Sequence, residues 1–173
     1  DMKNEKFQVS EKQYQDLKKV IFQPLENYQI GRNEIVAGTV SPSYILPLHG
    51  LQRLEKIMDE YCGGISAHYM TNEPLLTRGL ELLDMLKEDL DHLAAEDLHQ
   101  LMRAWELQHR VLASESVTHY TMFRTETRWP GYYYRADHMK LNDTDWHCFT
   151  LSRYNPESGE WAMEKAPVHH IID

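Results

Sequence analysis

Two short patterns of acidic and histidine residues are the first candidates for chemistry in this sequence. Glu96 and His99 form one Glu-x-x-His pair, and Glu106 and His109 form a second pair ten residues further along. In carboxylate-bridged helical bundles, such pairs supply metal ligands from two helices that face each other. Here both pairs fall on one predicted helix, about 15 Å apart along its axis, so they cannot share a metal site within one chain. We interpret them as surface or interface histidines and predict no metal site.

Two further histidine groups are weaker candidates for metal binding. His92, Glu96 and His99 would share one face of a continuous helix, but a predicted helix break lies between them. His169 and His170 are adjacent near the C-terminal end, and two ligands in a tail carry little specificity for a metal.

The sequence contains no nucleophile motif and no glycine-rich phosphate-binding loop. Cys62 and Cys148 are far apart and are not spaced as metal ligands. We interpret them as free thiols, with a single disulfide as the less favoured alternative. We therefore predict no catalytic, cofactor-binding or metal-binding residue in this chain. A globular chain of 173 residues without a chemical motif suggests a module of a larger protein.

The segment ETRWPGYYYRAD, residues 126–137, combines aromatic and basic side chains in an irregular stretch. Tyrosine, tryptophan and arginine are enriched at protein interfaces, so we predict a docking surface here. Arg124, Arg128 and Arg135 would form a basic island that attracts an acidic partner surface. The alternative is that the tyrosines fold back over the chain's own helices. The predicted docking residues are Arg124, Arg128, Trp129, Tyr132, Tyr133, Tyr134, Arg135, Asp137 and Trp146.

The elements that must position these residues are mostly helical. Apolar residues at helical spacing predict helices at residues 10–20, 48–62, 72–92 and 95–124. A capping box begins the first helix at Ser10. Pro24 is expected to end this helix, which leaves a long irregular connection up to Pro47.

Residues 125–173 form a C-terminal extension that lacks helical periodicity. Alternating side chains on either side of Asn155–Gly159 predict a β-hairpin at its end. The predicted fold is mainly α, an antiparallel three-helix bundle with a long N-terminal connection and an irregular C-terminal segment that ends in a short β-hairpin. A chain of this length is expected to form a single domain.

Charge and hydropathy exclude several classes of protein. The composition, with 42% hydrophobic and 26% charged residues, is that of a soluble globular chain. A formal net charge of −9 and a pI near 5.5 argue against a nucleic-acid partner. No apolar run approaches the roughly 18 residues of a membrane span, and no apolar run follows the charged N-terminal residues, so we expect neither a membrane span nor a signal peptide.

The sequence from Glu126 onward resembles the C-terminal region of flavoprotein subunits in the succinate dehydrogenase and fumarate reductase superfamily. Those subunits carry the pattern Glu-Ser-Arg-Gly-x-x-x-Arg-x-Asp, followed by a paired-acid turn and a tryptophan. Here Asn142 replaces the first acid of that turn, and His138-Met139 replaces an aromatic-proline pair. The residues that match the pattern are Glu126, Arg128, Arg135, Asp137, Asp143 and Trp146.

The insertion Trp-Pro-Gly-Tyr-Tyr-Tyr and the segments 47–65, 81–111 and 152–161 are similar to the alpha subunits of dissimilatory adenylylsulfate reductases. This resemblance implies the C-terminal helical domain of a cytoplasmic, FAD-dependent oxidoreductase that interconverts adenylylsulfate with AMP and sulfite. It also implies that FAD lies in a missing N-terminal domain and that iron-sulfur clusters lie in a partner beta subunit. The FAD-binding domain and the beta subunit are then the expected partners, and this chain is structural rather than catalytic. A freestanding interaction module and a metal-binding helical protein are the alternative functions.

Overall fold

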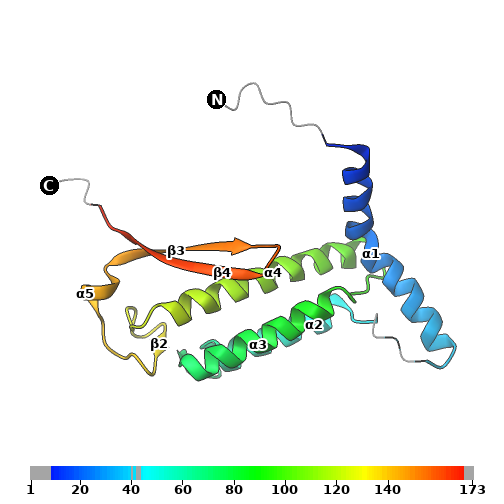
Figure 1. Ribbon diagram of the computed structural model, residues 1–173. Helices are drawn as coiled ribbons and strands as arrows, with labels where there is room; N and C mark the ends of the chain where they lie inside the picture. The colour runs from blue at the N-terminus through cyan, green and yellow to red at the C-terminus, as the bar shows by residue number, and fades with distance from the viewer. Residues whose placement is uncertain (1–8, 40, 42–43, 170–173) are drawn as a thin grey trace. The chain divides into compact units, whose positions relative to one another are not determined.

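The computed structural model describes residues 9–39, 41 and 44–169 of the chain. Most of these residues are helical, and the longer strands lie toward the C-terminal end (Figure 1). This confirms the predicted mainly helical fold that ends in a β-hairpin. Among the described residues, no helix has the length and apolarity needed to cross a membrane. The elements in chain order are α1 (Glu11–Val36), α2 (Pro47–Tyr61), β1 (Met70–Thr71), α3 (Glu73–Leu90), α4 (Leu98–Phe123), β2 (Tyr134–Arg135), α5 (Asp143–Trp146), β3 (Cys148–Asn155) and β4 (Glu160–Pro167).

The chain divides into two compact units. Residues 1–50 and 89–107 form the first unit, and residues 51–88 and 108–173 form the second. The first half of α4 therefore belongs to the first unit and its second half to the second. Every residue of the predicted docking surface belongs to the second unit.

In the first unit, α1 is longer than the sequence predicts. The predicted capping box is present, since the Gln13 amide donates to Ser10 Oγ (3.2 Å) and the Ser10 amide donates to Gln13 Oε1 (2.9 Å). The helix then continues through Pro24 to Val36. The predicted helix end at Pro24 and the long irregular connection from there to Pro47 are therefore wrong.

Contacts next to Pro24 explain why the helix continues. A proline inside a helix removes one backbone hydrogen bond and bends the axis, and α1 bends partway along its length (Figure 1). The Pro24 carbonyl accepts a hydrogen bond from the Ala95 amide (2.7 Å). One turn later, the side-chain amide of Asn27 donates to the carbonyls of Asp91 (3.2 Å) and Leu93 (2.9 Å). These contacts with residues distant in the sequence offset the cost of the proline.

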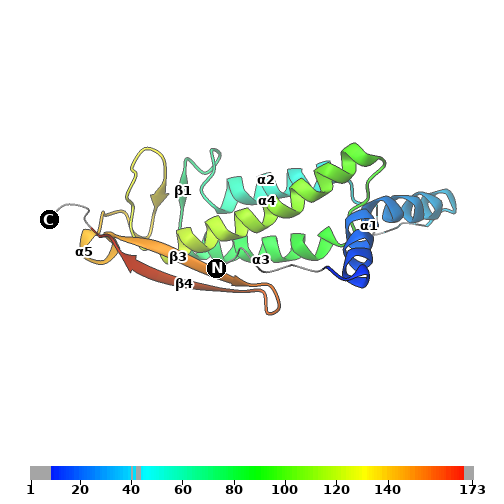
Figure 2. The same cartoon turned by 90° about the horizontal axis from the view of Figure 1, so that it is seen from above.

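In the second unit, α2, α3 and the second half of α4 pack around an aliphatic core (Figure 2). Asn72 caps α3, because its Oδ1 accepts a hydrogen bond from the Leu75 amide (2.9 Å). Gly79 allows α3 to approach the end of α2 closely, since a Cβ there would lie 3.0 Å from Cys62 Sγ. Cys62 Sγ also shares a hydrogen bond with Thr118 Oγ1 of α4 (3.3 Å). The core residues are Leu54, Ile57, Leu76, Leu83, Leu86 and Val111.

Two small sheets complete the second unit. β3 and β4 form an antiparallel hairpin in which Asn155 lies opposite Glu160. The hydroxyl of Tyr120 on α4 donates to Ser152 Oγ on β3 (2.9 Å), which fixes the hairpin to the bundle. β1 and β2 pair in parallel and join a loop before α3 to the predicted docking segment. No sequence pattern predicts this second pairing, because each strand has two residues and the two strands are far apart in the chain.

Candidate functional site

Arg135 connects the predicted docking segment to the end of α4. Its side chain is almost fully buried, and its backbone lies opposite Thr71 in the β1–β2 pair. The last carbonyls of a helix have no partner within the helix and carry the negative end of its dipole, so a cation is favourable there. Nη1 of Arg135 donates to two such carbonyls, those of Thr121 and Met122, and to the carbonyl of Arg124 just after the helix.

Asp137 extends this connection to the start of α3. Its two carboxylate oxygens accept hydrogen bonds from Nε and Nη2 of Arg135, both at 2.9 Å. Oδ2 also accepts from the amide of Glu73 (2.9 Å), where the positive end of the α3 dipole favours an anion. The hydrogen bonds from Arg135 outweigh the opposing effect of burial and lower the pKa of Asp137 to about 2. The Arg135–Asp137 pair therefore joins the end of α4 to the start of α3.

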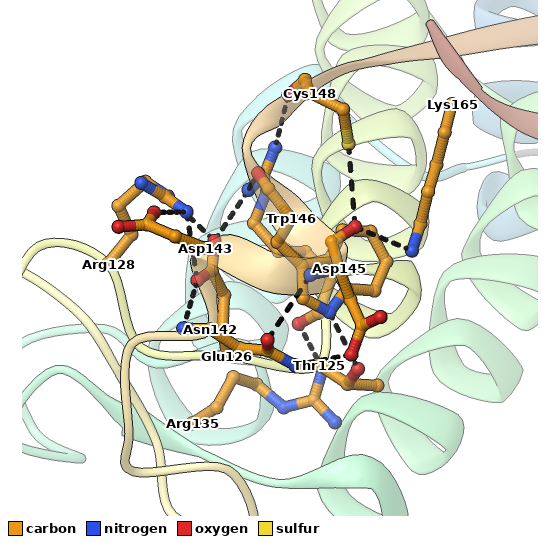
Figure 3. Close-up of polar contacts among 11 residues, drawn as sticks. Thr125, Glu126, Arg128, Arg135, Asn142, Asp143, Asp145, Trp146, Cys148 and Lys165 are labelled. Atoms are coloured by element: carbon orange, nitrogen blue, oxygen red, sulfur yellow. Dashed lines mark hydrogen bonds and ion pairs between the residues drawn. The ribbon is translucent and has the colours of Figure 1, made fainter. Parts of the chain in front are cut away.

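Glu126 is the centre of a second set of ion pairs (Figure 3). Its buried carboxylate accepts from Arg124 Nη1 (2.6 Å), Arg128 Nε (2.7 Å) and the Asn142 amide (2.9 Å). Arg128 also contacts Asp143 Oδ1 (2.9 Å). Burial by itself would raise the pKa of Glu126, but hydrogen bonds from the two arginines and from the Asn142 amide outweigh it, and the pKa is lowered. Glu126 is thus held as a buried carboxylate with its hydrogen bonds satisfied.

Trp146 of α5 packs next to this second set (Figure 3). The ring is buried, its Nε1 donates to Thr125 Oγ1 (3.0 Å), and it meets the Phe123 ring edge-on with centroids 5.4 Å apart. Two cations face the indole: the guanidinium carbon of Arg124 lies 5.3 Å from its centroid, and Lys165 Nζ lies 3.5 Å from it. Cation–π contacts of this kind contribute about 0.5–2 kcal/mol each. Trp146 is therefore part of the inner packing of the second unit.

Trp129 and Tyr132 are the two rings of the segment that face solvent, with 70% and 81% of their surface exposed. They lie on a tight turn, in which the Trp129 carbonyl accepts from the amides of Tyr132 (3.1 Å) and Tyr133 (3.2 Å). Gly131 within this turn has a φ of +94°, which glycine adopts without strain. Its amide donates to the hydroxyl of Tyr134 (2.6 Å). The two exposed rings are thus presented on a turn with a defined conformation.

Tyr133 packs on the chain itself. Its ring lies against Gly63, where a Cβ would come within 2.7 Å of Cε2 of the tyrosine. Burial raises the pKa of Tyr133 to about 12. The hydroxyl is buried next to Thr121, and among the described residues it makes no hydrogen bond of standard geometry.

Arg124, Arg128 and Arg135 are all paired with carboxylates. Arg124 and Arg128 bind Glu126 at 2.6 and 2.7 Å, and Arg135 binds Asp137 at 2.9 Å. We call these five residues the arginine–carboxylate cluster. The predicted basic island is wrong, because these positive charges are matched within the chain. The cluster therefore supplies a rigid support for the exposed rings rather than free charge or acid–base chemistry.

The structure does not bring the other chemical candidates together. No group of three or more His, Cys, Asp or Glu residues that could hold a metal ion occurs in the part of the chain that is described. His92 and His169 are exposed, and His170 lies outside the described residues. Cys62 and Cys148 are free thiols. The residues of the Glu-x-x-His pairs are all exposed: Glu96, His99, Glu106 and His109.

Sequence reasoning missed the groups that hold the cluster from outside the segment. The Glu73 amide lies 64 residues from Asp137, and no local pattern connects the two. The backbone N–H of Asn142 donates a hydrogen bond to the carboxylate of Glu126. The side chain of Asn142 also caps α5, since its Oδ1 accepts from the backbone N–H of Asp145 (3.2 Å). An asparagine before a short acidic turn is a recognisable cap signal, so this role of Asn142 could have been found in the sequence.

Comparison with known proteins gives consistent matches. The family described as fumarate reductase flavoprotein C-term matches residues 51–171. The alpha subunit of adenylylsulfate reductase from Megalodesulfovibrio gigas is 42% identical over 158 residues, which are 91% of this chain and 24% of that protein.

Solved structures extend this likeness to nearly the whole chain. Adenylylsulfate reductase from the hyperthermophilic Archaeoglobus fulgidus matches with a TM-score of 0.92 and 49% identity over 99% of this chain and 27% of that one. An adenosine-5-phosphosulfate reductase in complex with sulfite as a covalent adduct gives the same TM-score, identity and coverage. The chain thus spans about a quarter of the length of these relatives.

Proposed function

We propose that this chain, which belongs to the family of fumarate reductase flavoprotein C-terminal domains, is the docking domain of an adenylylsulfate reductase alpha subunit. The complete subunit interconverts adenylylsulfate with AMP and sulfite. The observation that carries this proposal is the likeness to adenylylsulfate reductase, at 49% identity over 99% of the chain. Sulfite bound as a covalent adduct to one of the similar enzymes supports the choice of substrate.

The cofactors and partners follow from the same proposal. FAD supplies the redox chemistry and is held by the part of the subunit outside this chain. The sequence of this chain has no glycine-rich dinucleotide loop. An iron-sulfur beta subunit is the second partner and exchanges electrons with the flavin. The complete enzyme works in the cytoplasm.

Within that enzyme, this chain binds the FAD-binding part through Trp129 and Tyr132. Their rings are exposed, whereas the other aromatic members of the docking prediction, Tyr133, Tyr134 and Trp146, are partly or fully buried. Aromatic side chains that insert into pockets of a partner carry much of the energy of protein interfaces. The arginine–carboxylate cluster fixes the backbone on both sides of the two rings, so that they meet the partner already in position.

The test is to assemble this chain with the separately expressed remainder of the subunit. We expect the complex to contain FAD and to show sulfite oxidation that depends on AMP when an artificial electron acceptor is added to take up the two electrons. Changing Trp129→Ala and Tyr132→Ala together should weaken assembly by at least about thirtyfold, the effect of losing one interface hot spot. Met85→Ala, which removes an apolar side chain on α3 that is also exposed (50%), is the matched control and should leave assembly unchanged.

The outcomes separate the two parts of the proposal. A complex that binds FAD but shows no AMP-dependent turnover of sulfite would reject the assigned reaction. A double variant that assembles as well as the unchanged chain would reject Trp129 and Tyr132 as the docking residues.

A further inference from the structure

The half of α1 before its bend, dark blue in Figure 1, carries an apolar stripe that the described part of the chain leaves exposed. The residues of the stripe follow one another at spacings of three and four positions and so lie on one side of the helix. We call them the α1 stripe: Tyr14, Leu17, Ile21, Pro24 and Tyr28. Pro24 and Tyr28 are buried and Ile21 is half-buried. Tyr14 and Leu17 are each more than half exposed. One continuous stripe is therefore packed at one end and open at the other.

The rest of the first unit holds α1 from the bend onward. The carbonyl of Ile21 accepts a hydrogen bond from Trp105 Nε1 of α4 (3.2 Å). The ring of Tyr28 stacks on that of Tyr44, with centroids 5.7 Å apart. Residues 11–20, by contrast, are all exposed. The chain thus fixes the second half of α1 and leaves the first half uncovered.

The uncovered half is nevertheless specified as a helix. The capping box at Ser10 satisfies two amides at the helix start, and Gln15 Nε2 donates to Glu11 Oε1 (2.7 Å). A helical segment this short is only marginally stable in water, because most of the stability of a helix comes from packing of its apolar face. A capped helix with an open apolar stripe therefore calls for a surface that covers Tyr14 and Leu17.

We propose that the α1 stripe docks into an apolar groove on the FAD-binding part of the same subunit, with Tyr14 and Leu17 as the anchors. This assignment rests on the proposed function. The family match is to the C-terminal part of a flavoprotein, and the relatives contain about three times as much chain outside the matched region as within it. In the proposed subunit, the FAD-binding part therefore precedes α1, and α1 is the helix of this chain that follows it most directly.

A partner on the same polypeptide fits this stripe better than a separate molecule does. Each partner of a stable protein pair buries roughly 800 Å², much more than the exposed parts of Tyr14, Leu17 and the neighbouring Val20 provide. A part of the same polypeptide needs a smaller contact, because the covalent link keeps it at a high local concentration. A second copy of this chain and the beta subunit have no such link to α1. The small size of the stripe therefore favours the FAD-binding part.

The direct test uses the complete enzyme with a benzophenone amino acid in place of Val20, which is exposed next to the α1 stripe and is not part of it. Irradiation followed by peptide mass spectrometry identifies what covers the stripe. We expect a cross-link to an apolar segment of the FAD-binding part. In enzyme reassembled from isotopically light and heavy subunits, both peptides should come from one subunit. The inference is overturned if the probe cross-links only to residues of this chain, to the beta subunit, to a second copy, or to nothing.

Hydrogen exchange measures the energetic part of the inference. The amides of residues 14–20 should exchange more slowly in the complete subunit than in this chain alone, because a covered stripe suppresses local opening. In the complete subunit, Tyr14→Ala together with Leu17→Ala should speed this exchange at least about tenfold. Alanine is a better helix former than tyrosine or leucine, so a loss of helix propensity does not explain faster exchange. In this chain alone, the double variant should exchange no faster than the unchanged chain.

Lys12→Ala together with Lys19→Ala is the matched control. Both lysines are exposed and lie on the side of α1 opposite the stripe, so their loss should leave exchange in the complete subunit unchanged. Equal effects of the two double variants in the complete subunit would overturn the inference. So would an equal gain in exchange rate for Tyr14→Ala with Leu17→Ala in this chain alone, because the two residues would then stabilise only the chain itself.

The outcome at α1 is separate from the outcome of the proposed function. Failure at the α1 stripe, together with AMP-dependent turnover of sulfite and weakened assembly on loss of Trp129 and Tyr132, would reject this inference and leave the proposed function intact. A complex without that turnover would reject the assigned reaction, whatever covers the stripe.

Discussion

Asp137→Asn is the sharpest test of the link between α3 and α4. The substitution keeps the shape of the side chain but removes the charge that accepts two hydrogen bonds from Arg135. The side chain is 26% exposed, so solvent screens the pair only in part. Hydrogen bonding to Arg135 lowers the pKa of Asp137 from 3.8 to about 2. A shift of this size corresponds to about 2 kcal/mol of folding stability at pH 7.

The pH dependence of this effect has a definite sign. The folded-state pKa of Asp137 is lower than its ordinary value, so the contribution is fully present above about pH 4 and is lost as the pH falls toward 2. At pH 3 about half of it remains, roughly 1 kcal/mol. The difference in unfolding free energy between the unchanged chain and Asp137→Asn should therefore shrink from pH 7 to pH 3.

Urea unfolding followed by tryptophan fluorescence at the two pH values measures this difference. The control is Asp143→Asn, which removes a carboxylate that also binds an arginine but is 60% exposed. An exposed pair of this kind contributes about 0.5 kcal/mol. Equal losses for the two variants at pH 7, or a loss for Asp137→Asn that is the same at pH 3 as at pH 7, would refute the argument.

Three further changes test the roles of other residues in the second unit. Glu126→Gln leaves two arginines without their buried partner and should lower the unfolding free energy by about 3 kcal/mol in urea titrations; a loss below 1 kcal/mol would contradict this. Trp129→Ala with Tyr132→Ala should change the same quantity by no more than about 0.5 kcal/mol, because both rings are exposed, and a large loss would show that they pack on the chain. Gly63→Ala should cost more than about 1 kcal/mol in thermal melts, since its φ is +85° and a Cβ would press on the ring of Tyr133; an unchanged melt would show that this contact is absent.

The bundle could be predicted from the sequence because its signals are local. Leucines at helical spacing and the Asn72 cap mark α3 without any knowledge of its partners. The path of α1 could not be predicted in this way. Pro24 is a local signal to stop, and the contacts that override it come from Asp91, Leu93 and Ala95, which are brought close only by folding.

In the docking segment too, the sequence does not show which side chains are exposed or which charges are paired. Its composition indicated an interface, but composition cannot separate a ring that faces solvent, such as Tyr132, from one that packs inside, such as Tyr133. The sequence predicts free positive charge on these arginines, because spacing alone does not show which carboxylates pair with them. Arg135 binds a carboxylate two residues away and helix carbonyls more than ten residues away, which only the folded backbone aligns.

The buried ion pairs matter for docking even though they leave no net charge on the surface. Ordering a loose loop costs about 1–2 kcal/mol for each residue. Ordering residues 126–137 only on binding would therefore cost more free energy than two exposed rings contribute to binding. Glu126 and Asp137 remove this cost in advance, because the ion pairs that they form hold both ends of the segment within the folded chain. Loss of the cluster should therefore weaken docking through Trp129 and Tyr132 even when both rings are intact. Glu126→Gln provides this test, provided that assembly is measured at a temperature where the variant chain is still folded.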